Sequence, residues 1–204
     1  MTDVGAREAR AAARREQTRA KILEAATAVI AERGYASTSV ADLIDAAGIA
    51  RGTFYLYFES RDAVFIDILD RFIEAVGDAM APVPADHPQP IAAMQHNVQR
   101  VVELFASNAP LVRVLFRDAV GHSAEVDAKV GALMGLAHQR VRGALVRGAE
   151  RGVLRQVNAP VVASLIVGAV KEVVQRWLDD PSSGGPAELV AALTDFGLYG
   201  LARA

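Results

Sequence analysis

The chain of 204 residues contains no cysteine and has only four histidines and one tryptophan. Without cysteine it cannot form a disulfide framework, a thiolate metal site or a cysteine nucleophile. No two of the histidines have the close spacing of a metal-ligand pair. We therefore expect no metal centre, and nothing in the sequence indicates a cofactor.

The chain also lacks an excess of charge of either sign. It has 22 lysines and arginines against 24 aspartates and glutamates, a net charge of −2, so that charge alone does not indicate a nucleic-acid partner. A local basic excess lies within residues 7–21, where Arg7, Arg10, Arg14, Arg15, Arg19 and Lys21 face only Glu8 and Glu16. We expect residues 1–14 to form a flexible arm, which either grips DNA or only aids solubility.

No hydrophobic run is long enough to cross a membrane. The longest, Ala159–Val170, is interrupted by Ser164 and falls short of the roughly 20 residues that a spanning helix needs. The N-terminus is polar and lacks the apolar segment of a signal peptide. We expect a soluble, cytoplasmic protein without a membrane partner.

Helical periodicity is what the sequence has in abundance. No stretch alternates between apolar and polar residues with hairpin turns at its ends, and Ala, Leu, Val, Arg and Glu dominate. The pattern predicts an all-α fold of about nine helices. We expect four short or medium helices between Thr18 and Val76, followed by helices at about 91–107, 109–120, 123–151, 159–179 and 187–202.

A small N-terminal domain precedes a larger helical domain in this pattern. We place the first at residues 1–62 and the second at 63–204, with the fourth helix joining them. Four of the eight prolines lie within Ala81–Pro90 and mark a firm break beyond that helix.

The segment from Thr38 to Phe58 has the pattern of a helix-turn-helix. Ser39 can cap the first short helix, with Asp42 three residues on as in a capping box. Gly48 permits the positive φ that a tight turn requires. Phe54 and Phe58 are one helical turn apart, so we expect them to anchor the second helix on one buried face.

The opposite face of that second helix carries Arg51, Gly52, Tyr55 and Leu56, with Thr53 and Tyr57 on its flank. An arginine near the start of such a helix can bond guanine O6 and N7 in the major groove. Glycine permits close approach to a sugar or phosphate, and the tyrosines offer hydroxyl donors. The alternatives are that the tyrosines only pack within the domain and that Arg51 is a solvated charge.

These residues resemble the DNA-binding domain of the tetracycline-repressor (TetR) family of bacterial transcription regulators. The similarity runs from about Arg19 to Phe65 and includes Arg19–Ala26, Gly34-Tyr35, Thr38–Leu43 and, most specifically, Ala47–Asp62 (AGIARGTFYLYFESRD). Ala50 stands where the family often has Ser, which removes a cap, and Ile44 stands where a small Ala is usual.

The resemblance implies a set of DNA contacts. Arg51, Gly52, Thr53, Tyr55 and Tyr57 would touch operator DNA. Phosphates would be bound by Thr38 and Ser39 at the start of the first short helix, and by Arg61 where the family more often has Lys.

The resemblance also implies that the larger domain binds a ligand and forms a homodimer through the helices at about 159–179 and 187–202. Their apolar surfaces are too wide for one buried stripe; the second includes Leu189, Val190, Leu193, Phe196, Leu198, Tyr199 and Leu201. For an unknown small hydrophobic ligand the candidate contacts are Met94, Phe105, Phe116, Met134 and His138. The plain alternative is that these side chains only fill the core.

Three classes of function are open to a helical protein of this kind: an enzyme, an adaptor and a DNA-binding regulator. An enzyme of helical fold would need clustered acid-base groups or metal ligands such as Glu-x-x-His pairs, and the larger domain has none. An adaptor that has lost DNA binding would not need the face around Arg51 and Tyr55. The sequence therefore favours a non-enzymatic, dimeric regulator that binds double-stranded operator DNA, with repression relieved by a small hydrophobic ligand.

Overall fold

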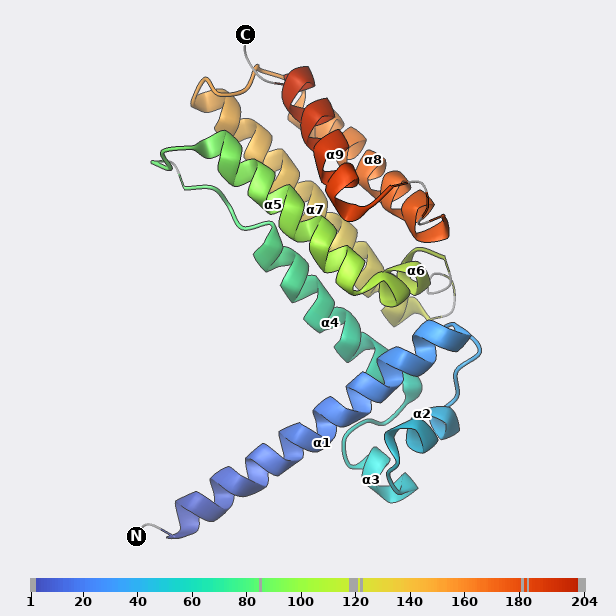
Figure 1. The fold of residues 1–204 in the computed structure, drawn as a ribbon. Coiled ribbons are helices and arrows are strands. Elements are labelled where there is room, and N and C mark those ends of the chain that lie inside the picture. The colour runs from blue at the N-terminus through green and yellow to red at the C-terminus, as the bar shows by residue number, and fades with distance from the viewer. Residues whose placement is uncertain are drawn as a thin grey trace.

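The computed structural model describes residues 3–84, 86–117, 121, 123–180, 182 and 184–201. Within this part of the chain it has nine α-helices, which confirms the predicted all-α class (Figure 1). They are α1 (Asp3–Arg33), α2 (Val40–Ala47), α3 (Arg51–Tyr55), α4 (Arg61–Ala79), α5 (Pro90–Ser107), α6 (Ala109–Arg117), α7 (Ala124–Glu150), α8 (Ala159–Asp179) and α9 (Pro186–Leu201).

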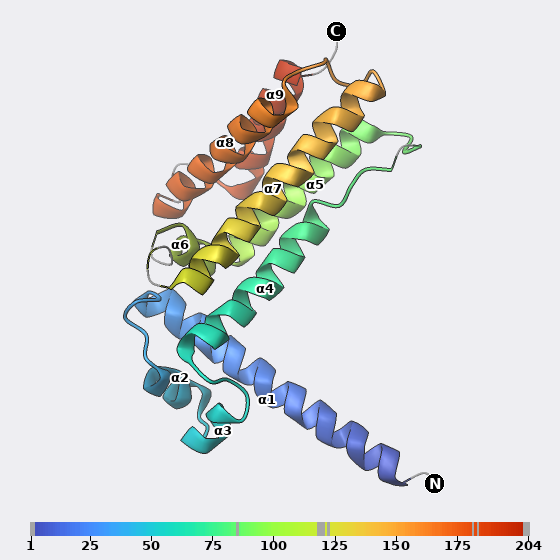
Figure 2. The same ribbon diagram turned by 180° about the vertical axis from the view of Figure 1, so that it is seen from behind.

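The helices form a small head and an elongated body. In Figures 1 and 2 the short helices α2 and α3 lie beside the middle and C-terminal part of α1, while α5, α7, α8 and α9 run side by side in the body. Helix α4 leads from the head into the body, where it packs on α5 and α7. It is therefore the one helix that belongs to both regions.

One continuous apolar core joins the head to the body. Tyr35, Leu43 and Phe54 are completely buried in the head, and Phe65 and Leu69 extend the same cluster along α4. Helix α1 packs against α2, α4 and α6, so the head rests on the body through apolar contacts.

Local signals in the sequence set the ends of the helices in the head. The predicted capping box is confirmed: Asp42 N–H donates to Ser39 Oγ at 3.2 Å, and Ser39 N–H donates to the Asp42 carboxylate at 2.8 Å. Gly48 ends α2 with φ 58° and ψ 46°, the left-handed conformation that the turn requires. Ser60 caps α4 by accepting a 3.0 Å hydrogen bond from Ala63 N–H.

The prediction of a flexible arm over residues 1–14 is corrected for residues 3–14. Helix α1 begins at Asp3 rather than near Thr18 and projects well beyond the rest of the head (Figure 1). This segment is rich in Ala, Arg and Glu, which are strong helix formers, so it propagates the helix that the buried part of α1 nucleates. The side chains of residues 5–17 are all exposed. This segment therefore lacks the apolar periodicity from which a packed helix is predicted.

The body differs little from its predicted organisation. Helix α8 packs mainly on α7 and α9 mainly on α5, and a second apolar cluster of Leu145, Leu154, Ala159 and Ala163 closes the end remote from the head. Residues 118–120 and 202, which the sequence analysis assigns to helices, lie outside the described residues. No helix in the described part of the chain is long and apolar enough to cross a membrane.

Candidate DNA-binding surface and ligand cavity

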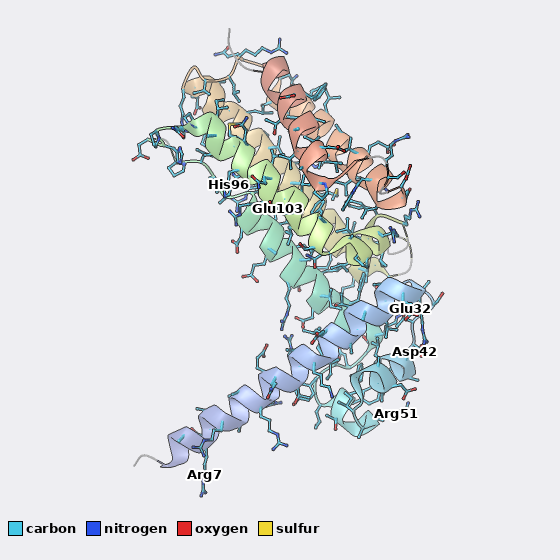
Figure 3. The ribbon with its side chains drawn as sticks, viewed as in Figure 1. Arg7, Glu32, Asp42, Arg51, His96 and Glu103 are labelled. Atoms are coloured by element: carbon cyan, nitrogen blue, oxygen red, sulfur yellow. The ribbon has the colours of Figure 1, made fainter. Side chains whose placement is uncertain are left out.

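Helix α3 has the two faces that its sequence predicts. Phe54 is completely buried and Phe58 is 5% exposed, whereas Tyr55 and Leu56 are 47% and 73% exposed. Arg51 is also exposed and lies on the surface of the head away from the body (Figure 3). The buried aromatic pair therefore holds a short helix whose other face is open to a partner.

The remaining residues of that face complete the surface. Gly52 is exposed, and Thr53 and Tyr57 are partly exposed on the flanks. The Arg51 guanidinium lies 5.8 Å from the centre of the Tyr55 ring, one helical turn on, which favours a defined position for both side chains. We call Arg51, Gly52, Thr53, Tyr55 and Tyr57 the recognition face.

Thr38 and Ser39 are less available to phosphate than the sequence analysis expects. Thr38 is only 2% exposed, and its hydroxyl donates a 2.8 Å hydrogen bond to the Gly34 carbonyl. Ser39 is exposed, but its hydroxyl donates to Asp42 at 2.5 Å. The structure thus gives Thr38 a role inside the head and leaves Ser39 at the surface as a helix cap.

The carboxylate of Asp42 lies at the N-terminus of α2, where the expected phosphate contact would be. It also pairs with Arg33 at 2.5 Å (Figure 3 labels Asp42). The hydroxyl of Ser39, its backbone N–H and the charge of Arg33 lower the pKa of Asp42 below its ordinary value of 3.8. An anion already occupies this helix terminus, which explains why the phosphate assignment fits it poorly.

Arg61 differs most from its expected role in binding phosphate. Its guanidinium donates to the carbonyl oxygens of Thr38 at 3.0 Å and Tyr35 at 3.1 Å, and pairs with Asp62 at 3.3 Å. It also lies 4.3 Å from the centre of the Tyr35 ring. Acceptors within the protein therefore engage Arg61, which ties the start of α4 to the segment between α1 and α2.

Tyr35 is a central residue of the head to which the sequence analysis assigns no role. Its hydroxyl donates a 2.6 Å hydrogen bond to Asp62, and its ring stacks on Phe65 with centres 4.5 Å apart. Burial, reinforced by the Asp62 carboxylate, raises the pKa of Tyr35 to about 12. Only the Gly34-Tyr35 pair in the family pattern signals this position in the sequence.

A cavity of about 270 Å³ lies in the body, between the end of α4 and helices α5, α7, α8 and α9. Four of the five predicted ligand contacts line it: Met94, Phe105, Phe116 and Met134. His138 is not part of the lining; its Nδ1 lies 2.7 Å from the carbonyl oxygen of Met134, within its own helix. The apolar part of the prediction thus coincides with a cavity, and its polar part does not.

The polar groups of the cavity are ones that sequence reasoning missed. Its lining is mostly apolar but includes four cations, Arg140, Arg147, Arg151 and Lys171, and no described acidic residue. The buried Nε of Arg140 and Oγ1 of Thr194 have no hydrogen-bond partner in the described structure. The sequence feature that could have indicated them is the spacing of Arg140, which shares one face of α7 with the cavity-lining residues Ala137 and Ala144.

The outer faces of α8 and α9 are partly apolar. Val161 and Leu165 on α8 are 54% and 65% exposed and do not line the cavity, whereas Phe196 on α9 is 73% exposed and also contributes to the cavity lining. Other side chains of the predicted dimer face turn inward instead: Leu189 is buried, and Val162 and Ile166 pack on the second apolar cluster. The side chains of Leu198, Tyr199 and Leu201 lie outside the described ones.

Nowhere in the described ranges do three His, Asp or Glu residues gather where they could hold a metal ion. The sites that the geometry does bring together are the recognition face on α3 and the cavity of the body. Helix α4 connects them, because Ser60 caps it at the head and Val76 lines the cavity.

Comparisons with known proteins match both regions. Residues 22–68 match the bacterial regulatory proteins of the tetR family, and residues 87–201 match the tetracyclin repressor-like C-terminal domain. The fatty acid metabolism regulator protein of Bacillus subtilis is 25% identical over 78% of this chain and 82% of its own length. The transcriptional regulator TtgR of Pseudomonas putida is 26% identical over 82% and 83%.

Solved structures show the same fold. FadR from Bacillus subtilis, in complex with stearoyl-CoA, has a TM-score of 0.70 and 22% identity, and the match covers 86% of this chain and 95% of FadR. The matched C-terminal domain alone spans more than half of the chain. The chain belongs to the TetR family of DNA-binding transcriptional regulators, which is not a family of enzymes.

Proposed function

We propose that this protein is a cytoplasmic homodimeric repressor that binds a palindromic operator and is released from it by a hydrophobic ligand. The observation that carries the proposal is the course of α4. This helix starts at the helix-turn-helix, through Ser60 and Arg61, and ends at a cavity, where Val76 lines the wall. A ligand that moves the cavity end of α4 would therefore also move the end of α4 that contacts the helix-turn-helix.

The recognition face supplies the sequence-specific contacts in this proposal. Arg51 bonds a guanine edge in the major groove, while Thr53, Tyr55 and Tyr57 contact bases and phosphates nearby. Gly52 lets the backbone approach the DNA closely. Phosphate contacts of Ser39 are secondary, because Asp42 engages its hydroxyl.

Dimerisation places two recognition faces on one side of the DNA. The exposed apolar side chains of Val161 and Leu165 on α8, which do not line the cavity, support pairing of α8 and α9 with the same helices of a second copy. Two-fold symmetry would set the recognition helices about 34–36 Å apart, which matches successive major grooves.

Ligand control follows from differential binding. A ligand that binds more tightly when α4 is displaced favours a dimer in which the two heads have a different separation. Such a ligand lowers the affinity for the operator, and the operator lowers the affinity for the ligand by the same factor. The names of the relatives support a hydrophobic ligand, since one is a fatty acid metabolism regulator and FadR was solved with stearoyl-CoA. The largely apolar lining of the cavity is consistent with that class.

Selection and sequencing of the DNA that the purified protein binds is the most informative experiment. We expect a palindromic site, with affinity that falls steeply as salt rises because phosphate contacts release counterions. Arg51→Ala and Tyr55→Ala should each weaken binding, Arg51→Ala by about 1–3 kcal/mol with relaxed preference at one base position. Arg155→Ala, at an exposed site on the body, is the control.

Three outcomes would contradict parts of the proposal. Recovery of no palindrome would favour an adaptor that keeps the fold without the DNA activity. Unchanged binding by both recognition-face variants would remove the assignment of α3. A reporter transcribed more strongly with the protein bound upstream would make it an activator instead of a repressor.

A further inference from the structure

The unpartnered polar atoms of the described structure lie mainly in one place, the wall of the cavity. Nε of Arg140 on α7 and Oγ1 of Thr194 on α9 are both buried without a hydrogen-bond partner, and both residues line the cavity. A buried donor without an acceptor destabilises the folded protein, because it loses its hydrogen bonds to water and gains none in return. Two such groups in the lining of one apolar cavity indicate a site that is completed by an acceptor from outside the chain.

A second arginine reaches toward the same turn of α7. A Cβ placed on Gly143 would lie 2.9 Å from Nη1 of Arg147, so this guanidinium folds back along the helix beside Gly143. Gly143 lies one turn from Arg140 and is its neighbour on the helix surface. Arg140 and Arg147 thus both line the cavity from α7, two helical turns apart.

The charge around these groups is not neutralised within the described structure. No aspartate or glutamate there lines the cavity, and neither Arg140 nor Arg147 has a carboxylate partner among the described residues. Lys171 and Arg151 add positive charge at other points of the wall. A partly buried guanidinium without a counter-ion is costly, and a carboxylate or a phosphate is the anion whose oxygens fit its parallel N–H donors.

We infer that the ligand of this cavity is an anionic amphiphile: an apolar chain that lies along Met94, Phe105 and Met134, with a carboxylate or phosphate-type head bound by Arg140, Arg147 and the hydroxyl of Thr194. The inference rests on the proposed function for the role of the cavity and goes beyond it by assigning the charge and position of the ligand's polar end. Both a free long-chain carboxylate and a coenzyme A thioester have this chemistry.

Calorimetric titration with three ligands of one chain length tests the inference. Decanoate, decan-1-ol and decanoyl-coenzyme A share the apolar tail and differ in the head. We expect at least one of the two anions to bind about tenfold or more tightly than the alcohol, because hydrogen bonds to charged groups are the strong ones. The anion that binds identifies the source of the negative charge.

Matched variants locate that preference in the cavity. Arg140→Met keeps the length and apolar stem of the side chain and should remove most of the tenfold preference, and Thr194→Val should remove part of it. Arg142→Met, an exposed position on the same helix, should leave the preference unchanged. Thermal unfolding without ligand should show Arg140→Met at least as stable as the wild type, because the variant removes a buried unpartnered donor.

Equal affinity for the alcohol and both anions, no binding of any of the three, or anion affinity unaffected by Arg140→Met overturns the inference. DNA binding is measured separately on the same preparation. A protein that selects a palindrome but prefers no anion contradicts this inference alone. One that binds the anion at Arg140 but no DNA contradicts the proposed function alone.

Discussion

The guanidinium of Arg61 lies 4.3 Å from the centre of the Tyr35 ring, at the junction between α4 and the segment that follows α1. Cation–π contact, hydrogen bonds from Arg61 to two backbone carbonyls of that segment and the bond from Tyr35 to Asp62 all act at this one point. Because α4 also reaches the cavity, the proposed mechanism predicts that a displacement of α4 would pass to the helix-turn-helix through this junction.

Removal of the guanidinium tests the strength of this junction. Arg61→Ala should lower the free energy of unfolding by about 1–3 kcal/mol, because the carbonyls of Tyr35 and Thr38 lose a charged donor. The stability of Arg61→Lys should lie between those of the wild type and Arg61→Ala, since lysine keeps the charge but lacks the planar set of N–H donors. Urea unfolding measures the effect, with Arg155→Ala as a control expected to change stability by less than about 0.5 kcal/mol. Equal stability of Arg61→Ala and the control would refute the role.

The raised pKa of Tyr35 predicts a loss of stability in alkali. The folded protein holds the phenol proton more tightly, with a pKa of about 12 against 10.0 for an unperturbed tyrosine. The stabilisation is therefore complete below pH 10 and is lost as pH rises toward 12. Unfolding free energies of wild type and Tyr35→Phe should converge over this range. A constant difference between the two proteins would contradict the assignment.

Two glycines of the helix-turn-helix should separate folding from DNA binding. Gly48→Ala places an L-residue at φ 58°, which costs roughly 1–2 kcal/mol and should lower the unfolding midpoint. Gly52 lies in α3, and a Cβ there would meet nothing within 4 Å. Gly52→Ala should therefore leave the fold intact or stabilise it by about 0.5–1 kcal/mol.

The two variants should rank in the opposite order in a DNA-binding assay. Gly52→Ala adds a methyl group to the recognition face and should weaken operator binding, whereas folded Gly48→Ala should bind nearly as the wild type does. Wild-type affinity in Gly52→Ala would show that this glycine does not approach the DNA.

Much of the head could be predicted because its signals are local. The cap at Ser39, the left-handed turn at Gly48 and the buried pair Phe54 and Phe58 each depend on a few neighbouring residues. The partners of Thr38 and Arg61 could not be predicted in the same way. They depend on how α1, α2 and α4 meet, and there the protein itself supplies the hydrogen-bond partners that the resemblance assigned to phosphate.

The cavity shows the same limit. Apolar side chains at helical spacing predicted four of its lining residues, because a buried face leaves a periodic pattern. Arg140 and Thr194 lie on helices that are far apart in the sequence, and only tertiary packing brings them into the lining of one cavity. His138 was a polar candidate by residue type, but it is not part of the lining and its ring contacts the carbonyl oxygen of Met134.

Disruption of the outer face of α8 should separate the two subunits. Leu165→Glu puts a charge on a side chain that is 65% exposed in one chain and does not line the cavity, so the monomer should still fold. In the proposed dimer the charge would be buried, which is strongly unfavourable. Light scattering should report a monomer, and operator affinity should drop on the order of a hundredfold as the bivalent contact is lost.

Val146→Glu provides the matched control for this substitution. Val146 is 41% exposed on α7, outside the proposed interface. This variant should remain a dimer with wild-type operator affinity. A dimer in Leu165→Glu, or a monomer in Val146→Glu, would place the interface on another surface.

Two glycines of α7 should respond to the same substitution with opposite signs. A Cβ on Gly148 would lie 2.5 Å from Cδ1 and 2.7 Å from Cγ of Leu154, inside the second apolar cluster. Gly148→Ala should therefore force Leu154 to move and destabilise the protein by about 1–3 kcal/mol. A Cβ on Gly135 would meet nothing within 4 Å, so Gly135→Ala should stabilise α7 by about 0.5–1 kcal/mol. Thermal unfolding midpoints measure both effects. The residue change is identical at the two positions. A stabilising effect at both would mean that helix propensity, rather than the close approach of Leu154, determines the effect of Gly148→Ala on stability.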